Sequence, residues 1–273
     1  DIKNNKIINI DNIDIDLSAN NKFRNQLVLK RKNKNFFLDA KSLNFEVFIN
    51  KMSKNDKSRN LFKIFDDLNS KIVINIAKAN LDSESEIKNI SGFVEIKKNK
   101  IFNLNLNSSF SDKEKIFLKV KTNSDNSVIT NFSSDRAKPF VKKYKFIKGF
   151  DGGNIDFSSS RIGSVTKSKL IIDNFKVQEV PILAKILTLA SLQGIADLLT
   201  GEGIRFTDFE MIYSKKGKVT TIDEIYSIGP AISIMLDGYI EEEKLVSLRG
   251  TLVPATTINR TISSIPLIGD ILV

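Results

Sequence analysis

With 273 residues, of which 41% are hydrophobic, the chain is long enough for one large β domain or two domains of ordinary size. It contains no histidine and no cysteine, which excludes Ser-His-Asp and Cys-His catalytic groups and the usual zinc sites. The formal net charge is +10, but the basic clusters at 30–34 and 142–145 belong to no recognisable nucleic-acid-binding module. We therefore expect no nucleic-acid partner. The excess lysines indicate a solvated surface or, alternatively, attraction to anionic lipid headgroups.

Alternation of apolar and polar residues predicts that most of the chain is β-strand. Phe102, Leu104 and Leu106, for example, alternate with asparagines. Short polar segments such as 124–126 and 215–217 separate the alternating runs and predict turns. We therefore expect an antiparallel meander with one apolar and one polar face. The predicted strands lie at 8–17, 43–49, 72–76, 102–106, 116–120, 207–213, 232–240 and 246–252.

Three short segments have helical spacing instead. The segment 56–68 places Leu61, Phe65 and Leu68 three and four residues apart. This spacing predicts an amphipathic helix that packs on the sheet. Shorter helix candidates lie at 135–146 and 256–263.

The segment 181–199 predicts a long helix that is apolar on every side. Pro181 suits a first helical position, and Gly201 supplies the backbone geometry that ends a helix. A helix that is apolar all round must be covered by protein or by lipid. Lys185 and Asp197 argue against a membrane span, because a charge near the bilayer centre costs about 2.5–3.5 kcal/mol. We therefore expect this helix to lie under the sheet or to contact lipid while packed on the fold.

The composition changes near residue 149. Of the 13 glycines, Gly92 alone precedes Gly149, so positions that need special backbone geometry concentrate in the second half. We predict a repetitive β segment at 1–148 and a specialised region at 149–273, within one continuous β architecture. The chain begins at Asp1 without a methionine and ends inside an apolar run, so we expect both ends to be truncated.

Four short sequence motifs occur in the second half of the chain. They are 191–204 (SLQGIADLLTGEGI), the turn 227–230 (SIGP), 249–255 (RGTLVPA) and 265–271 (IPLIGDI). In this order they resemble the C-terminal region of AsmA-like proteins, and most closely that of the YhdP-type members. The resemblance extends over about 165–273 and is weak before residue 85.

The resemblance implies both a fold and a function. AsmA-like proteins of this type are anchored by an N-terminal helix in the inner membrane of Gram-negative bacteria and extend through the periplasm. The implied fold is mainly β with a few helices: a long curved antiparallel β-sheet that forms an open apolar groove, with one long apolar helix packed on it. The implied function is that of a segment of an envelope-spanning phospholipid-transfer protein involved in outer-membrane biogenesis. The implied partners are phospholipid acyl chains, a membrane reached through an anchor outside the sequence, and other envelope proteins.

Strand alternation by itself is equally compatible with other architectures. A β-sandwich or a closed barrel has the same pattern, because its apolar residues meet each other instead of lipid. A second class of function also remains open, that of a structural or assembly module of the cell envelope that binds proteins without carrying lipid. A lipid groove requires one continuous apolar face, whereas an assembly module is expected to close its core.

No group of residues indicates catalysis. The carboxylate pairs Asp14/Asp16 and Asp208/Glu210 lack further groups that would bind a metal or position a substrate, so we interpret them as solvated strand residues. The glycines of 149–153 lack the lysine and hydroxyl of a phosphate loop and precede a strand, which predicts a turn. We therefore expect no enzymatic activity, no cofactor and no bound metal.

A binding site, if the chain has one, is expected to be a surface of apolar side chains on the predicted long helix and on two predicted strands. Lys185 is included because an ammonium group among apolar neighbours must reach an anion or water. The candidate lipid-contact residues are Ile182, Leu183, Lys185, Ile186, Leu187 and Leu189 of the helix, and Phe209, Met211, Ile232, Ile234 and Leu236 of the strands.

Overall fold

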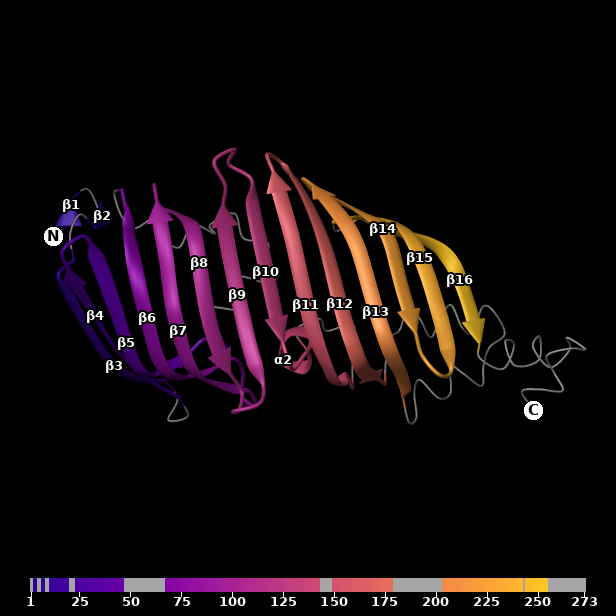
Figure 1. The fold of residues 1–273 in the computed structure, drawn as a ribbon, viewed down its shortest axis with the longest axis horizontal. Helices are drawn as coiled ribbons and strands as arrows, with labels where there is room; N and C mark the ends of the chain where they lie inside the picture. Colours follow the sequence, from indigo (N-terminus) through magenta and orange to yellow (C-terminus); the bar gives the residue numbers. More distant parts are fainter. Residues whose placement is uncertain are drawn as a thin grey trace, which may run out of the picture. The chain divides into compact units, whose positions relative to one another are not determined.

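The chain divides into two compact units, Asp1–Ser134 (unit 1) and Asp135–Val273 (unit 2). Both units are mainly β, as predicted (Figure 1). The boundary between the units and the predicted change near residue 149 fall in the same connection, which joins strand β10 (Val128–Ser134) to strand β11 (Asp151–Ile162). The computed structural model describes residues 2–3, 6–7, 10–19, 23–46, 67–142, 149–178, 203–242 and 244–254.

Unit 1 contains an open sheet of eight strands, β3 to β10, in the order of the sequence. Neighbouring strands pair antiparallel except β5 and β6, which run parallel. A parallel neighbour requires a crossover connection, here the segment 45–69. The other strands are β1 (Ile2–Lys3) and β2 (Lys6–Ile7), which form a separate pair, and β3 (Asn12–Ala19), β4 (Phe23–Lys32), β5 (Asn35–Asn44), β6 (Ser70–Asn80), β7 (Glu86–Lys97), β8 (Lys100–Ser109) and β9 (Lys115–Thr122).

Unit 2 contains six strands, β11 to β16, also in sequence order and all antiparallel to their neighbours. Of the helix predicted at 135–146, the described residues are helical only in α2 (Lys138–Val141), where a proline occupies the first turn and needs no N–H donor. The Ala137 N–H that precedes α2 donates a 2.7 Å hydrogen bond to the Gly153 carbonyl on β11. The remaining strands are β12 (Val165–Val177), β13 (Ile204–Lys216), β14 (Val219–Ile228), β15 (Ile232–Glu241) and β16 (Leu245–Pro254).

The predicted strands match seven of these elements, β3, β6, β8, β9, β13, β15 and β16. The strand predicted at 43–49 is wrong at Phe45 and Glu46, because β5 ends at Asn44, and its residues 47–49 lie outside the described residues. The predicted turn at 124–126 is confirmed, with Asn126 at a φ of 62°. The turn predicted at 215–217 instead centres on Gly217 and Lys218, because β13 continues through Lys216.

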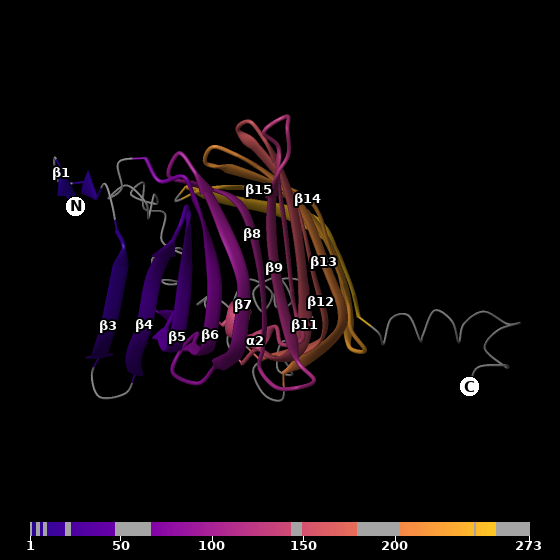
Figure 2. The ribbon, with the colours of Figure 1, turned by 60° about the vertical axis from the view of Figure 1, so that its left-hand side comes forward.

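The strands of both units are bowed (Figure 2), and two glycines lie where neighbouring strands come very close. Gly238 in β15 has a φ of 148°, and a Cβ atom there would lie 2.0 Å from the Ser247 carbonyl oxygen. The register of β14 shifts directly opposite, between Ile222 and Ile225. Gly92 in β7 likewise has a φ of 144°, beside a register shift in β7. A bulge combined with a missing side chain lets a sheet bend locally, which explains why these positions are glycine.

The fold class is therefore confirmed as mainly β, built from open and mostly antiparallel sheet. The long apolar helix predicted at 181–199 lies outside the described residues, as does the helix predicted at 256–263. Most of the helix predicted at 56–68 also lies outside them, and its last two residues, Asp67 and Leu68, are described and are not helical. Among the residues that the structure describes, no helix is long and apolar enough to cross a membrane.

Candidate functional site

One face of the unit 1 sheet is apolar from strand to strand. Because side chains alternate along each strand, residues opposite one another on neighbouring strands point to the same face and form a row across the sheet. The middle row of this apolar face takes one residue from each strand, β3 to β10. Its members are Ile13, Leu29, Leu38, Ile74, Gly92, Leu106, Leu118 and Phe132.

Every residue of this middle row is half-buried. Other positions of the same face are buried: Ile76 and Ile90 pair on β6 and β7, and Val94, Ile96 and Leu104 form a buried cluster on β7 and β8. Half-buried neighbours pack against this cluster from the same face and from the segment before β6. They are Leu68, Ile72, Ile74, Leu106, Leu118 and Val120. The apolar face of unit 1 thus combines buried positions with a middle row whose side chains stay half-buried.

Unit 2 also has an apolar face, made of two rows across β11 to β16, of which the first is mostly buried and the second mostly half-buried. Four of the candidate residues predicted on strands lie in these rows. Phe209 and Met211 are on β13, Ile234 and Leu236 are on β15, and β14 lies between the two strands. The first row is Ile155, Ile172, Phe209, Ser227, Ile234 and Leu252, and the second is Phe157, Leu170, Met211, Ile225, Leu236 and Gly250.

The predicted strand candidates differ in burial. Phe209, Met211 and Leu236 are half-buried and keep area for contact with a ligand. Ile232 and Ile234 are buried, with Ile232 fully enclosed at 0% exposure. The structure therefore brings all five onto one face and separates them into accessible and enclosed positions. The helix candidates Ile182, Leu183, Lys185, Ile186, Leu187 and Leu189 lie outside the described residues.

Aromatic side chains extend the apolar face of unit 2 at one end of β11 to β13. The rings of Phe150 and Phe206 stack on Phe175 with centroids 5.2 and 5.4 Å away, and Phe209 meets Phe175 edge-on at 6.3 Å. Asn174, with a φ of 54°, interrupts the alternation of β12 just before Phe175. This interruption explains why sequence alternation did not identify the aromatic cluster.

Polarity rises toward the opposite end of the same face. After the two apolar rows comes a mixed row that begins with Ser159, Ser168 and Tyr213. The next row, here called the rim, starts with Arg161, Thr166 and Lys215. Thr220, Ile240 and Val246 complete the rim. The face thus passes from aromatic through aliphatic to hydroxyl-bearing and cationic side chains along the strand direction.

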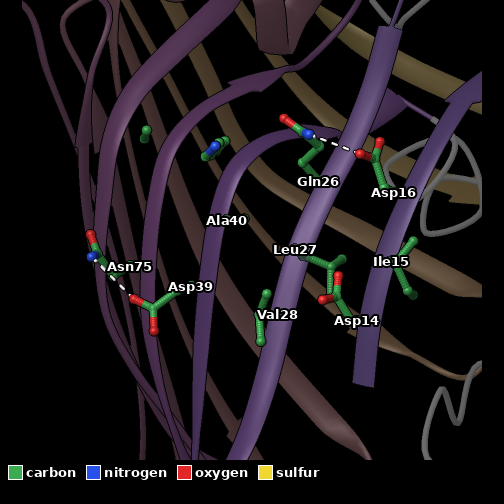
Figure 3. Close-up of a pocket in the computed structure, with 11 residues that line it drawn as sticks. Asp14, Ile15, Asp16, Gln26, Leu27, Val28, Asp39, Ala40 and Asn75 are labelled. Atoms are coloured by element: carbon green, nitrogen blue, oxygen red, sulfur yellow. Dashed lines mark hydrogen bonds between the residues drawn. The ribbon is translucent and has the colours of Figure 1, made fainter. Parts of the chain in front are cut away.

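The opposite face of unit 1 is polar, and a shallow cavity of about 390 Å³ lies over β3 to β6 (Figure 3). The Asn75 amide donates to Asp39 at 3.3 Å there, and the Gln26 amide donates to Asp16 at 2.9 Å. Asp14, predicted as a solvated strand residue, is exposed on this face. The carboxylates Asp208 and Glu210 occupy the corresponding face of unit 2, where Glu210 pairs with Lys169 at 2.7 Å.

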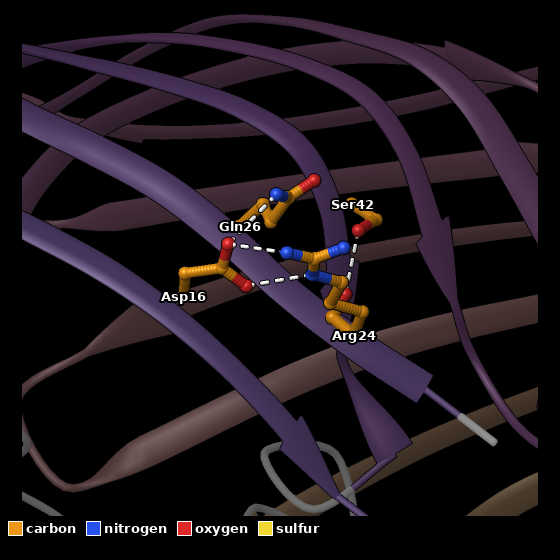
Figure 4. A network of polar contacts seen from close by, with 4 residues as sticks. All are labelled: Asp16, Arg24, Gln26 and Ser42. Carbon is orange, nitrogen blue, oxygen red and sulfur yellow. Dashed lines mark hydrogen bonds and ion pairs between the residues drawn. The ribbon is translucent and has the colours of Figure 1, made fainter. Parts of the chain in front are cut away.

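Asp16 is held by a bidentate contact with Arg24, whose Nε and Nη2 lie 2.7 and 2.6 Å from its two carboxylate oxygens (Figure 4). Hydrogen bonds from Arg24 and then Gln26 stabilise the charged form and lower the pKa of Asp16 from 3.8 to about 2. Because the folded-state pKa is lowered, the contribution to stability is present above pH 3.8 and is lost as the pH falls toward 2.

We expect the Asp16 carboxyl carbon to titrate by NMR with a pKa of about 2, and to return toward 3.8 in Arg24→Gln. The control is Ser42→Ala, because the Ser42 hydroxyl donates to the Arg24 carbonyl and does not touch the carboxylate. An Asp16 pKa unaffected by Arg24→Gln would contradict the bidentate contact. The carboxylate is exposed, so only a slight change in melting temperature should accompany the titration.

No protein-family model, no curated protein and no solved structure matches this chain. The class that the fold and the faces define is a mainly β protein of open sheet, with an apolar face in each unit.

Proposed function

We propose that the chain is a lipid-binding segment that holds phospholipid acyl chains against the apolar faces of its sheets, without enzymatic activity. The observation that supports this most directly is the middle row of unit 1. It takes an apolar side chain from seven of eight consecutive strands, and each of the seven is half-buried. Apart from the short pair β1–β2, the described strands of unit 1 belong to one sheet, so none of them forms a second layer over this face.

The apolar face of unit 1 is large enough that covering it with a ligand is more favourable than leaving it in water. At about 4.8 Å between neighbouring strands, a row across eight strands is about 34 Å long. Apolar area in water costs about 25 cal/mol per Å², and soluble monomers rarely expose contiguous apolar patches larger than a few hundred Å². An acyl chain laid on the row replaces that water with methylene contacts and makes no demand on hydrogen bonding.

The polarity of unit 2 fits an amphipathic ligand in the same way. About 20 Å separates the row of Phe209 from the rim at Lys215, six residues along β13. Acyl chains would lie over the two apolar rows, while a headgroup phosphate would lie near Arg161 and the hydroxyls of Thr166 and Thr220. Among the described residues Arg161 forms no ion pair, and its charge suits a phosphate.

The aliphatic side chains of the rows would also allow a bound acyl chain to move along the sheet. Successive strands offer an acyl chain equivalent aliphatic contacts, so the chain can move from one strand to the next without leaving apolar surroundings. With the resemblance to AsmA-like proteins, we propose a periplasmic segment of an inner-membrane-anchored envelope protein in a Gram-negative bacterium. Its proposed partners are phospholipids and other envelope proteins.

A photocrosslinking experiment on the hairpin β9–β10 tests this function. With p-benzoylphenylalanine in place of Phe132, on the apolar face, we expect phospholipid adducts detectable by mass spectrometry of the protein purified from cells. The matched control is the same replacement at Phe117, which pairs with Ser133 on the polar face and is 49% exposed. Adducts should form several-fold more often at position 132 than at position 117.

The opposite pattern would contradict the proposal. Equal lipid adducts at both positions would indicate non-specific contact with membrane. Protein adducts at position 132 without lipid would instead favour the structural or assembly module, whose apolar face is covered by another chain.

A further inference from the structure

Three hairpin tips lie next to one another at one end of unit 2. The β11–β12 tip contacts the β13–β14 tip, because Val165 pairs with Lys216. The β13–β14 tip in turn contacts the β15–β16 tip, because Val219 pairs with Glu241, which pairs with Leu245. The first two tips lie at the top of Figure 1. We call residues 161–167, 215–219 and 241–246 the tip region.

The tip region exposes large aliphatic side chains. Ile162 is 68% exposed, more than any other large apolar side chain identified in the described residues, and Val219 is 40% exposed. Leu245 and Val246 are 48% and 53% exposed. Single exposed apolar residues are normal on a soluble protein, but Ile162, Val219 and Leu245 lie in one row across the three tips and form a patch that indicates an interaction surface.

The same region has a net positive charge. Its cations are Arg161, Lys167, Lys215, Lys216, Lys218 and Lys244, and its acids are Glu241, Glu242 and Glu243. Two of these acids are already neutralised within the region, since Lys215 pairs with Glu242 at 2.6 Å and Lys244 with Glu241 at 2.7 Å. The positive charge is thus concentrated on the first two hairpin tips, around the exposed side chains of Ile162 and Val219.

We propose that the tip region docks on the surface of an anionic phospholipid bilayer. Short aliphatic side chains on hairpin tips can enter the interface between headgroups and acyl chains while the sheet stays outside. The surrounding lysines and arginine then lie at the level of the headgroup phosphates, where their attraction to anionic lipid adds to the apolar contribution. The rim of the apolar face ends at these same tips. The docking surface is nevertheless independent of whether that face holds acyl chains.

The chain contains no tryptophan, which allows a single-site fluorescence test. We expect the emission of Ile162→Trp to shift to the blue and to be quenched by brominated acyl chains in vesicles of equal parts phosphatidylcholine and phosphatidylglycerol. The matched control is Met235→Trp, at a position 51% exposed on the polar face of β15 away from the tips. The control should show neither change.

The charge contribution is tested by flotation with the same vesicles. Combining Arg161→Gln, Lys216→Gln and Lys218→Gln should weaken vesicle binding by about tenfold or more. The charge control, Lys119→Gln with Lys121→Gln on unit 1, should leave binding unchanged. Because all these positions are exposed, melting temperatures should match the wild type and confirm that the variants fold.

Two results would overturn the docking surface. One is a blue shift at both tryptophan positions or at neither. The other is equal loss of binding from the tip and control lysine sets, which would indicate adsorption through overall charge. Acyl-chain adducts at position 132 do not depend on either result, so the failure of the docking surface and the failure of lipid binding are distinguishable.

Discussion

Alanine in place of Gly238 is expected to destabilise unit 2 by about 3 kcal/mol, through overpacking and a strained φ. The added Cβ would lie 2.0 Å from the Ser247 carbonyl oxygen and 3.0 Å from the Leu248 Cα. Both atoms belong to the backbone of β16, so no side-chain rotation can relieve the contact. The melting temperature should fall by about 10 °C in a thermal unfolding experiment followed by circular dichroism.

The matched control is Gly217→Ala in the β13–β14 turn. Gly217 also has a positive φ, 60°, but a Cβ atom there meets no other atom within 4 Å. Its substitution should cost only the backbone strain of a left-handed residue, about 1 kcal/mol. Equal losses at Gly217 and Gly238 would show that backbone conformation alone, and not the close approach of β16, requires glycine in β15.

The face on which a strand residue lies could be predicted where apolar and polar residues alternate without interruption. In β15 the sequence predicts one face for Ile232, Ile234, Leu236 and Ile240, and the pairing of β14 with β15 places them together. Alternation was less informative in β11, whose centre is a run of serines at 158–160 with little hydrophobic signal. A strand paired within a sheet needs only moderate hydrophobicity, because backbone hydrogen bonds and one apolar face are sufficient to hold it.

The rows themselves could not be predicted from the sequence, because a row depends on register. Shifts such as those at Ile222/Ile225 in β14 and at Gln26/Leu27 in β4 change which residues face each other beyond them. The parallel pairing of β5 with β6 likewise depends on a long crossover that local pattern does not specify. The rim at Arg161 and Thr166 was missed for the same reason, since its residues come together only through register.

Aspartate in place of Ile232 is expected to unfold unit 2 or to destabilise it by several kcal/mol, because an unpaired carboxylate would be buried where the side chain is 0% exposed. The same change at Leu236, four residues along β15 on the same face, should have a smaller thermodynamic effect because Leu236 is half-buried. Thermal unfolding of the two variants measures this difference.

Leu236→Asp, which should have the smaller effect on stability, is expected to lower the amount of bound phospholipid. Leu236→Asp would place a carboxylate among Ile225, Met211 and their neighbours in the second row, where an acyl chain is proposed to lie. Folded Leu236→Asp protein should therefore retain several-fold less phospholipid, measured by mass spectrometry of an organic extract, while Met235→Asp on the polar face retains the wild-type amount. Wild-type retention in a folded Leu236→Asp variant would mean that this face packs against protein. In that case the half-buried residues of the second row are core positions like Ile232, and the apolar face of unit 2 is not where lipid binds.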